Sequence, residues 1–534
     1  MFLVMSMKRV FCFFLVLLVF RAEFPLLGQL PDLPDWINDT VFIDPTHVGE
    51  EKGTSEKPFN SLNDVLETPN TAYLWKRGTT YFHETGMKWM MDYIYLGAYG
   101  TGSKPVLRPN TPHRSVQFLG THSFIQNIEV FPQDTNSSRG VEFTLKERSV
   151  GFADSVIVHG CFIGFGGWNC SRLEVNNLVV HDMKHDGMYF ANCDSIIFKG
   201  CHVWNINTDW AWRPDIAYSG GDCIQTEDVG YVYVDASILD HSYWGGKFAL
   251  ITNGNDTTIC KNSTFKSTEG TSALYISKTF MDKCHVIGGD KGVWNIGGNR
   301  FFVHNTIFEN CKTAIYGTAS EVYNCTFVNI PETACFGWVL GWDVRNSIFY
   351  NVNKIFASTE NVIATRNIYF NPNNPQPTSD WGENNLRVDP LFVDHENRNY
   401  QLQSISPAID SGVYLEKVQE DILHTQRPQN NKYDIGAYEY RVEDLYKKPA
   451  LNVFTRLDPL HGTFYIFFRD KRITGDTTIK IYDTTGRLLA IKNTEVYLDD
   501  VKTINTFEPM QGVFFININN NNKKFTLKTL APRE

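Results

Sequence analysis

Three short segments of the chain share one form: a charged residue at a glycine-containing turn, followed by a run with strand character. They read "KHDGMYFAN", "SGGDCIQTED" and "WGGKFALITN", and the charged residues at the turns are Asp186, Asp222 and Lys247. If the segments lie on successive turns of a repetitive fold, these side chains form one column at a spacing of roughly 5 Å, which Ser272 continues. Two carboxylates that close repel each other and need a counter-charge or a function. Lys247 is the natural counter-charge, so we expect a compact Asp–Asp–Lys cluster.

A structural role competes with this interpretation. Aspartate is common where a chain turns, because its carboxylate caps local backbone N–H groups. Either aspartate taken singly fits that role as well as a catalytic one. The three residues together favour a function.

The longest interruption of the repeated pattern lies just before Asp222 and reads "WNINTDWAWRPDIAYSGGDC". Five of the 12 tryptophans of the chain fall between residues 168 and 244. Aromatic rings stack on the apolar C–H faces of sugars, although some of these tryptophans must instead pack the inserted segment onto the fold. The candidate substrate-binding residues around the column are Trp210, Trp212, Trp244, Arg213, His185 and His241.

The elements that position these residues are short strands in tandem. A small or polar residue followed by two β-favouring ones recurs about ten times between residues 161 and 369, as in "CFI", "CHV", "SIL", "STF" and "TIF". Each unit holds two or three strands separated by Gly, Asn or Asp, without helical periodicity. Such repeats predict a solenoid in which each turn pairs with its neighbours about 4.8 Å away.

The middle of the chain resembles a right-handed parallel β-helix of the pectate-lyase-like superfamily. "VFIDPTHVGEEKGTSEKPFNSLNDV" resembles the entry segment of such proteins, where a short helix caps the solenoid, and "SPAIDSG" and "DIGAYEY" resemble their closing segment. The resemblance covers residues 40–440. It implies the fold but not one activity, since this fold carries lyases, hydrolases, esterases and adhesins.

Several families of that superfamily are lyases that use a lysine base and a Ca²⁺ ion held by aspartates. The resemblance therefore implies β-elimination of a uronic-acid polysaccharide, with Lys247 as base and Asp186 and Asp222 holding Ca²⁺. Glu227 and Asp228 could add oxygen ligands. Without the metal, or an arginine such as Arg213 in its place, the two carboxylates would raise the pKa of Lys247 and keep it protonated.

Two other functions use the same residues differently. A glycoside hydrolase would take Asp222 and Asp186 as its two carboxyl groups, with Lys247 keeping one ionised. The "GGDC" turn only faintly resembles the double-aspartate "GDDC" of polygalacturonases, because Gly221 replaces the first aspartate. A non-catalytic surface protein would bind glycans through the tryptophan-rich segment alone.

Composition and charge limit the partners. A formal charge of −10 argues against nucleic acid as the main ligand. Lys8 and Arg9 precede the apolar run "VFCFFLVLLVF", which predicts a signal peptide over residues 1–28 and no membrane span after its removal. Eleven cysteines in an exported chain could form one or two disulfides, but Cys161, Cys201, Cys284 and Cys325 recur at the same place in the repeat, which favours stacked buried thiols.

The composition changes near residue 448. "TIKIYDTTGRLLAIKN" and "GVFFININNNNKKFTLKTL" predict alternating strands of a small β-sandwich over residues 451–534, after a linker at 441–450. This part resembles the type IX secretion sorting domain of Bacteroidota. The resemblance implies transport across the outer membrane by the type IX machinery, and we expect a secreted or surface-bound monomer.

Overall fold

The structure is a computed structural model of the whole chain. It describes residues 33–441 and 453–531 except for short gaps at 64, 136–137, 147–148, 209–220, 243–246, 255–256, 296–300, 319–320, 338–340, 359, 375–381, 383, 459–462, 469–472, 474, 484–486, 497–499, 506–511 and 521–522. The predicted signal peptide and linker therefore lie outside the described residues, apart from Arg441.

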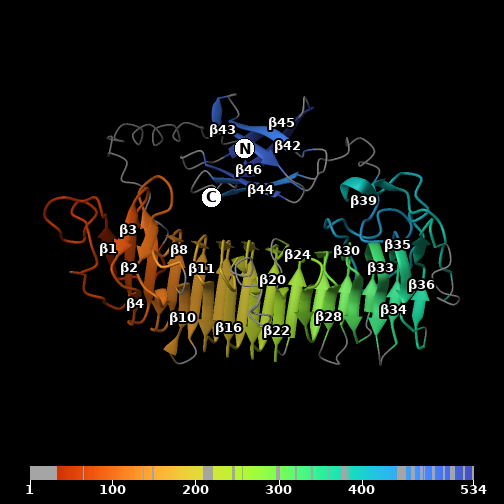
Figure 1. Cartoon of the computed structure of the whole chain (residues 1–534), viewed down its shortest axis with the longest axis horizontal. Helices are drawn as coiled ribbons and strands as arrows, with labels where there is room; N and C mark the ends of the chain where they lie inside the picture. Colours follow the sequence, from red (N-terminus) through yellow and green to blue (C-terminus); the bar gives the residue numbers. More distant parts are fainter. Residues whose placement is uncertain are drawn as a thin grey trace, which may run out of the picture.

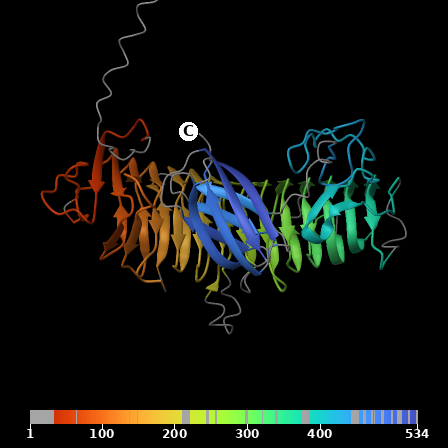
Figure 2. The same cartoon turned by 90° about the horizontal axis from the view of Figure 1, so that it is seen from above.

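Residues 39–370 form a parallel β-helix, as predicted, with three strands in most turns (Figures 1 and 2). One turn, for example, consists of β14 (Arg172–Asn176), β15 (Val179–His181) and β16 (Met188–Ala191), and the next turn repeats it with β17 (Ser195–Lys199), β18 (His202–Trp204) and β19 (Ile224–Glu227). Each strand pairs in parallel with the equivalent strand of the adjacent turn. Three faces result.

The first face is a 14-stranded sheet. Its other strands are β1 (Asp39–Ile43), β2 (Thr71–Lys76), β5 (Ile94–Tyr99), β8 (Ser123–Gln126), β11 (Val150–Asp154), β20 (Tyr231–Asp235), β23 (Thr257–Lys261), β26 (Thr279–Asp282), β29 (Phe302–His304), β32 (Glu321–Tyr323), β34 (Asp343–Arg345) and β36 (Ile363–Thr365).

The second face is built from shorter strands. Its other members are β3 (Thr80–His83), β6 (Val106–Pro109), β9 (Glu129–Val130), β12 (Ile157–His159), β21 (Ile238–Asp240), β24 (Thr264–Lys266), β27 (His285–Ile287), β30 (Ile307–Glu309), β37 (Ile368–Phe370) and the first parts of β33 (Thr326–Gly337) and β35 (Ile348–Phe356).

The third face carries the candidate site. Its other members are β4 (Met87–Trp89), β7 (Arg114–Phe118), β10 (Arg139–Thr144), β13 (Ile163–Trp168), β22 (Phe248–Asn253), β25 (Ser272–Ile276), β28 (Lys291–Asn295), β31 (Thr313–Gly317) and the later parts of β33 and β35.

The corner between the first and second faces explains the frequent asparagines. Two residues before each second-face strand from β9 to β37, one residue has a positive φ between 46° and 63°. Asparagine and glycine tolerate this left-handed conformation best. Asn127, Asn177, Asn262, Asn305, Asn324 and Asn346 hold it in six of these eleven turns, and Gly200 in a seventh.

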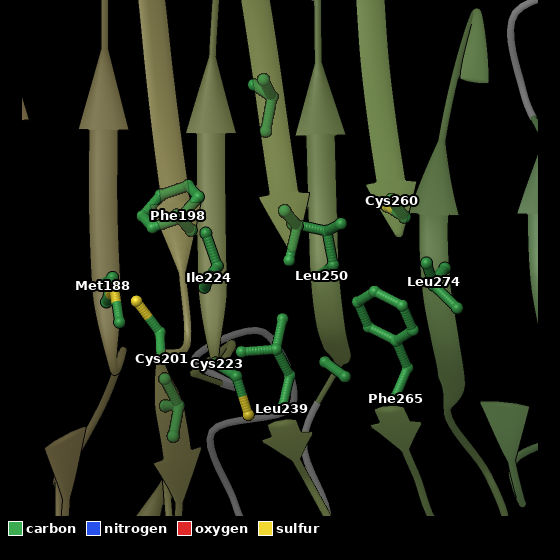
Figure 3. Packing of buried hydrophobic residues seen from close by; sticks show 14 of the residues in the cluster. Met188, Phe198, Cys201, Cys223, Ile224, Leu239, Leu250, Cys260, Phe265 and Leu274 are labelled. Carbon is green, nitrogen blue, oxygen red and sulfur yellow. The ribbon is translucent and has the colours of Figure 1, made fainter. Parts of the chain in front are cut away.

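The interior of the solenoid is a continuous apolar core in which Met188, Ile224, Leu250 and Leu274 stack from turn to turn (Figure 3). Ten cysteines are described, and all are buried thiols outside any disulfide, which confirms the prediction of buried thiols. Cys201, Cys284 and Cys325 each precede a second-face strand, whereas Cys161 precedes the third-face strand β13. The prediction that Cys161 shares their place was therefore wrong, because the same "polar–apolar–apolar" pattern recurs at two corners of the turn.

Both ends of the core are covered. At the entry end, Leu62 and Val65 pack against the core, and the described residues there form no helix, contrary to our expectation. At the other end, β38 (Phe392–Asp394), the 3₁₀ helix η3 (His395–Asn397) and β39 (Asn399–Leu402) lead into the closing segment. That segment is anchored by the buried Arg427, which pairs with Glu439 at 2.5 Å and donates to the Gly436 carbonyl at 2.9 Å.

The C-terminal part forms two antiparallel sheets around its own apolar core. One contains β40 (Val453–Asp458), β41 (Thr463–Phe468) and β44 (Asp500–Asn505), and the other contains β43 (Leu488–Val496), β42 (Gly475–Tyr482), β45 (Gly512–Asn520) and β46 (Lys523–Ala531). This arrangement agrees with the predicted small β-domain.

The buried thiols give a first testable prediction. Because all ten thiols are buried, and burial raises the pKa of Cys284 to about 12, the ten should not react with a thiol reagent in the folded protein and should all react in denaturant. We expect a reductant to leave the melting temperature unchanged. A disulfide among them, found by mass analysis without reduction, would contradict this structure.

Candidate functional site

Asp186 and Asp222 stand next to each other at the corner between the second and third faces. Asp186 precedes β16 and Asp222 precedes β19, and the register pairs Met188 with Ile224. The two aspartates are therefore equivalent residues of adjacent turns, at a spacing of about 4.8 Å. The backbone N–H of Asp222 donates to Oδ1 of Asp186 at 2.9 Å. Their exposed fractions are only 3% and 1%.

Lys247 does not continue this column, and that prediction was wrong by one residue. The register pairs Ile224 with Leu250 and Phe248 with Ser272, so the residue beside Asp222 is Phe248. The backbone N–H of Phe248 donates to Oδ1 of Asp222 at 2.8 Å, while the side chain of Lys247 is exposed. A shift of one position changes the face to which a strand residue points, so Lys247 is not stacked between carboxylates.

Without a stacked cation, the aspartate pair retains a proton. Burial, and then the charge of Asp186, raises the pKa of Asp222 well above its usual range. The Phe248 N–H group and the more distant Lys247 ammonium oppose this shift without cancelling it. Asp222 therefore keeps its proton to a higher pH than an ordinary aspartate, beside a second carboxyl group.

A neighbouring carboxylate shows the effect of a paired cation. Asp240, at the end of β21, is also almost fully buried, but its Oδ2 lies 2.7 Å from Nζ of Lys266. Burial alone would raise the pKa of Asp240, whereas the Lys266 ammonium and the donors of Ser242 together hold it below its usual value. The contrast identifies the missing close cation as the feature that distinguishes Asp222.

The two predicted histidines lie at this corner. Nδ1 of His185 is 2.9 Å from Oδ2 of Asp186, and its ring stacks on Phe162. His241 is buried, and its Nε2 lies 2.6 Å from the Gly221 carbonyl oxygen, so the ring donates a hydrogen bond to the turn that presents Asp222. His241 thus positions the turn that presents Asp222, and its role in substrate binding stays a prediction.

The four predicted Ca²⁺ ligands do not fit one metal ion. Glu227 and Asp228 lie at the far end of β19, about 16–20 Å along the strand from Asp222. Glu227 accepts hydrogen bonds from Tyr189 and Gln225, each at 2.7 Å, and Asp228 occupies a left-handed corner position with φ 51°. Among the residues that the structure describes, no three His, Cys, Asp or Glu side chains gather as a metal site.

The outer surface of the third face adds residues that the sequence analysis did not assign. Tyr189 donates to Glu227, and burial, that bond and the charges of Glu227 and Asp186 raise the pKa of its phenol. The Trp168 ring lies 5.4 Å from the Tyr189 ring, and the Arg139 guanidinium lies 5.1 Å from the Trp168 ring. Strand alternation could have identified Tyr189, because its neighbours Met188 and Phe190 point into the core.

The candidates Trp210, Trp212, Arg213 and Trp244 lie outside the described residues. The site that can be described therefore consists of the Asp186–Asp222 pair, His185, and an outer patch formed by Arg139, Trp168, Tyr189 and Glu227. It provides an acid, a second carboxyl group, an aromatic platform and a cation, which together suit a sugar substrate.

Comparison with known proteins identifies the C-terminal part. Residues 458–531 match the model of the secretion system C-terminal sorting domain. The chain carries a type IX secretion sorting domain. This domain indicates transport across the outer membrane, ending in release or attachment at the cell surface. Within the described residues, no helix is long and apolar enough to cross a membrane.

Several solved structures have a similar fold but low sequence identity to this chain. Tailspike protein 2 of an Escherichia coli O157:H7 bacteriophage is 9% identical, with 92% of this chain and 68% of that chain covered and a TM-score of 0.35. The A-module of a mannuronan C-5 epimerase from Azotobacter vinelandii is 10% identical, covering 59% and 88%, with a TM-score of 0.29.

A tailspike capsular polysaccharide depolymerase of an Acinetobacter baumannii bacteriophage is also 10% identical, covering 87% and 73%, with a TM-score of 0.24. These proteins act on polysaccharides or belong to phage tails, but the likeness is too distant to carry their chemistry to this chain. A search of curated proteins gave no match.

The raised pKa of Asp222 predicts how stability depends on pH. The folded-state pKa lies above the unfolded one, so the stabilisation from this proton is complete below about pH 4 and is lost as pH rises toward the folded pKa. Asp222→Asn keeps an acceptor for the Phe248 N–H group and removes the titration. As the pH rises, the free energy of unfolding should fall faster in the wild type than in the variant. The difference should reach up to about 1.4 kcal/mol per pH unit.

Denaturant unfolding of both proteins between pH 4 and pH 8 measures this difference. Asp186→Asn is the matched comparison, because it removes the repulsion but not the burial and should flatten the profile only in part. Parallel profiles for all three proteins would contradict the assignment of a proton to the pair.

Proposed function

We propose that the chain is an exported enzyme that cleaves glycosidic bonds in an extracellular polysaccharide, with Asp222 as the general acid. The observation that carries the proposal is the buried carboxyl group of Asp222 directly beside Asp186, where burial and the Asp186 charge raise its pKa well above the usual range. A carboxylic acid that keeps its proton at mildly acidic to neutral pH can protonate the departing glycosidic oxygen. A sorting domain that directs the chain out of the cell is consistent with a polymeric substrate found there.

Hydrolysis fits the geometry better than metal-assisted elimination, which was our first expectation from the sequence. A lyase of that kind needs a deprotonated base and a cation close to the uronate carboxylate. Lys247 is not stacked with the aspartates, and the predicted Ca²⁺ ligands lie at opposite ends of β19. Two carboxyl groups on adjacent turns, by contrast, stand near the separation of about 5–5.5 Å that suits a retaining hydrolase.

The proposed steps are balanced with the two carboxyl groups alone. Asp222 gives its proton to the leaving oxygen while the Asp186 carboxylate attacks the anomeric carbon and forms a glycosyl ester. Asp222, now ionised, takes a proton from a water molecule as the oxygen of that water attacks the anomeric carbon. The ester bond breaks, Asp186 leaves as a carboxylate, and the sugar retains its configuration. His185, beside Asp186, helps to orient that carboxylate.

The competing structural role has a distinct consequence. Both aspartates accept a backbone N–H bond from the next turn and both are buried, as a pure capping role requires. A cap needs only an acceptor oxygen, which asparagine also supplies, whereas an acid needs the proton. Asparagine variants therefore separate the two roles.

Turnover on a panel of neutral and acidic polysaccharides tests the proposal. We expect Asp222→Asn to lower kcat by about 10²–10⁴-fold, and Asp186→Asn to do the same, with folding retained. Reducing ends should appear without the ultraviolet absorbance of unsaturated uronate, and a chelator should have no effect. His159→Asn, on the second face, is a control that should keep full activity.

Each alternative has its own result. Unsaturated product that depends on Lys247 and disappears with chelator would restore the elimination mechanism. Full activity of both asparagine variants would assign the pair to capping and overturn the proposal. Glycan binding without turnover would show a binding protein.

A further inference from the structure

Four aromatic side chains form a stripe along the outer surface of the third face. Tyr275 of β25 pairs with Trp294 of β28, Trp294 pairs with Tyr316 of β31, and Tyr316 pairs with Phe336 of β33. Successive ring centroids lie 5.2, 6.0 and 4.8 Å apart. Each of the four side chains is partly exposed, while the residues on either side of each along its strand are buried or lack a side chain.

The stripe lies on the same column as Tyr189 of the candidate site. Tyr189 pairs with Gln225, Gln225 with Ile251, and Ile251 with Tyr275. Gln225 belongs to the strand that Asp222 precedes, so the stripe begins two turns beyond Asp222 and ends five turns beyond it. At about 4.8 Å per turn, Trp294 is about 14 Å from Asp222 along the solenoid axis.

The core does not account for these residues. The interior positions of the same strands are filled by Leu274, Val293, Ile315 and Cys335, all of them fully buried. Outward positions of a solvent-facing sheet are normally polar, and a row of partly exposed large rings is typical of a binding surface. The regular spacing matches a ligand that repeats along the axis.

A lysine stands within the stripe. Lys291 follows Phe248 and Ser272 in the aspartate column, three turns beyond Asp222. Its Nζ lies 4.2 Å from the Trp294 ring centroid and 4.9 Å from that of Tyr316. The nearby Asp290 is paired with Lys312 at 2.9 Å, and Glu269 is paired with the same lysine at 2.7 Å. The described residues give Lys291 no ion pair of its own within 4 Å.

We propose that Tyr275, Trp294, Tyr316 and Lys291 bind the polysaccharide several sugar units away from the cleaved bond, and that these units carry carboxylates. The proposal rests on the proposed function for the place of cleavage, but binding at the stripe does not depend on it. The rings present faces and edges to the C–H surfaces of the sugars, and the Lys291 ammonium pairs with a carboxylate held above Trp294. A chain bound this way runs along the solenoid axis, so the enzyme acts within long chains.

Chain-length dependence tests this inference. For Trp294→Ala, we expect kcat/KM to fall roughly tenfold on oligosaccharides long enough to reach the stripe, and to stay unchanged on tri- and tetrasaccharides. The matched control is Tyr231→Ala, a partly exposed tyrosine on the first face that should change neither value. Equal loss on short and long substrates, or no loss on either, would overturn the stripe as a binding surface.

Binding measured with Asp222→Asn separates this inference from the proposed function. Calorimetry with long acidic oligosaccharides should show an affinity about tenfold weaker when Trp294→Ala is added. Lys291→Met should remove the preference for the acidic polymer over the same polymer with its carboxylates reduced. If these variants bind more weakly but the wild type shows no turnover, the stripe is supported and the hydrolase is rejected. If the wild type turns over substrate and neither variant changes that turnover, the stripe alone is rejected.

Discussion

The parallel pairing of each turn with the next is the constraint on which the rest of the structure depends. Backbone hydrogen bonds hold adjacent turns about 4.8 Å apart and in register, so every residue lies directly beside its equivalents in the neighbouring turns. Apolar residues then stack into the core, and asparagines recur at the left-handed corners. Charged residues at equivalent positions are therefore held side by side even when they repel each other.

The Asp186–Asp222 pair is a direct consequence of this register. Like charges side by side in a ladder are destabilising, and burial together with the charge of Asp186 raises the pKa of Asp222, which favours a proton on this carboxyl group. Lys266 shows that a buried carboxylate of this solenoid can be held beside a cation, since it neutralises Asp240 in the two turns that follow. A pair that lowers stability and lacks its own cation is the kind of arrangement found where a function requires it.

The fold could be predicted from the sequence because each repeat has the same pattern of short strands and turn residues. Short β-favouring runs separated by Asn and Gly can bury their apolar residues only by stacking, and the closing motifs resemble those of known β-helices. The site was predictable only in part. The equivalence of Asp186 and Asp222 followed from "HDG" and "GDC", but the alignment of "GKF" with them was wrong because one residue decides the register.

The positions of other residues relative to the site could not be predicted, because the sequence does not give distances in space. Glu227 and Asp228 are near Asp222 in number, yet an extended strand separates them from it in space. Alternation along the strand marks Tyr189 as an outward residue, but only the register shows that Tyr275, Trp294 and Tyr316 lie side by side on adjacent turns. Strand direction and register, more than residue type, thus determine which side chains meet.

The most direct test of this account is the protonation state of Asp222, measured by infrared spectroscopy of the carboxyl stretch at about pH 6, two units above the ordinary aspartate pKa. We predict a protonated-carboxyl band in the wild-type protein that is absent from Asp222→Asn and that titrates at lower pH in Asp186→Asn. An ionised Asp222 at this pH, with the same spectrum in all three proteins, would contradict the claim that burial and the neighbouring Asp186 carboxylate keep a proton on Asp222.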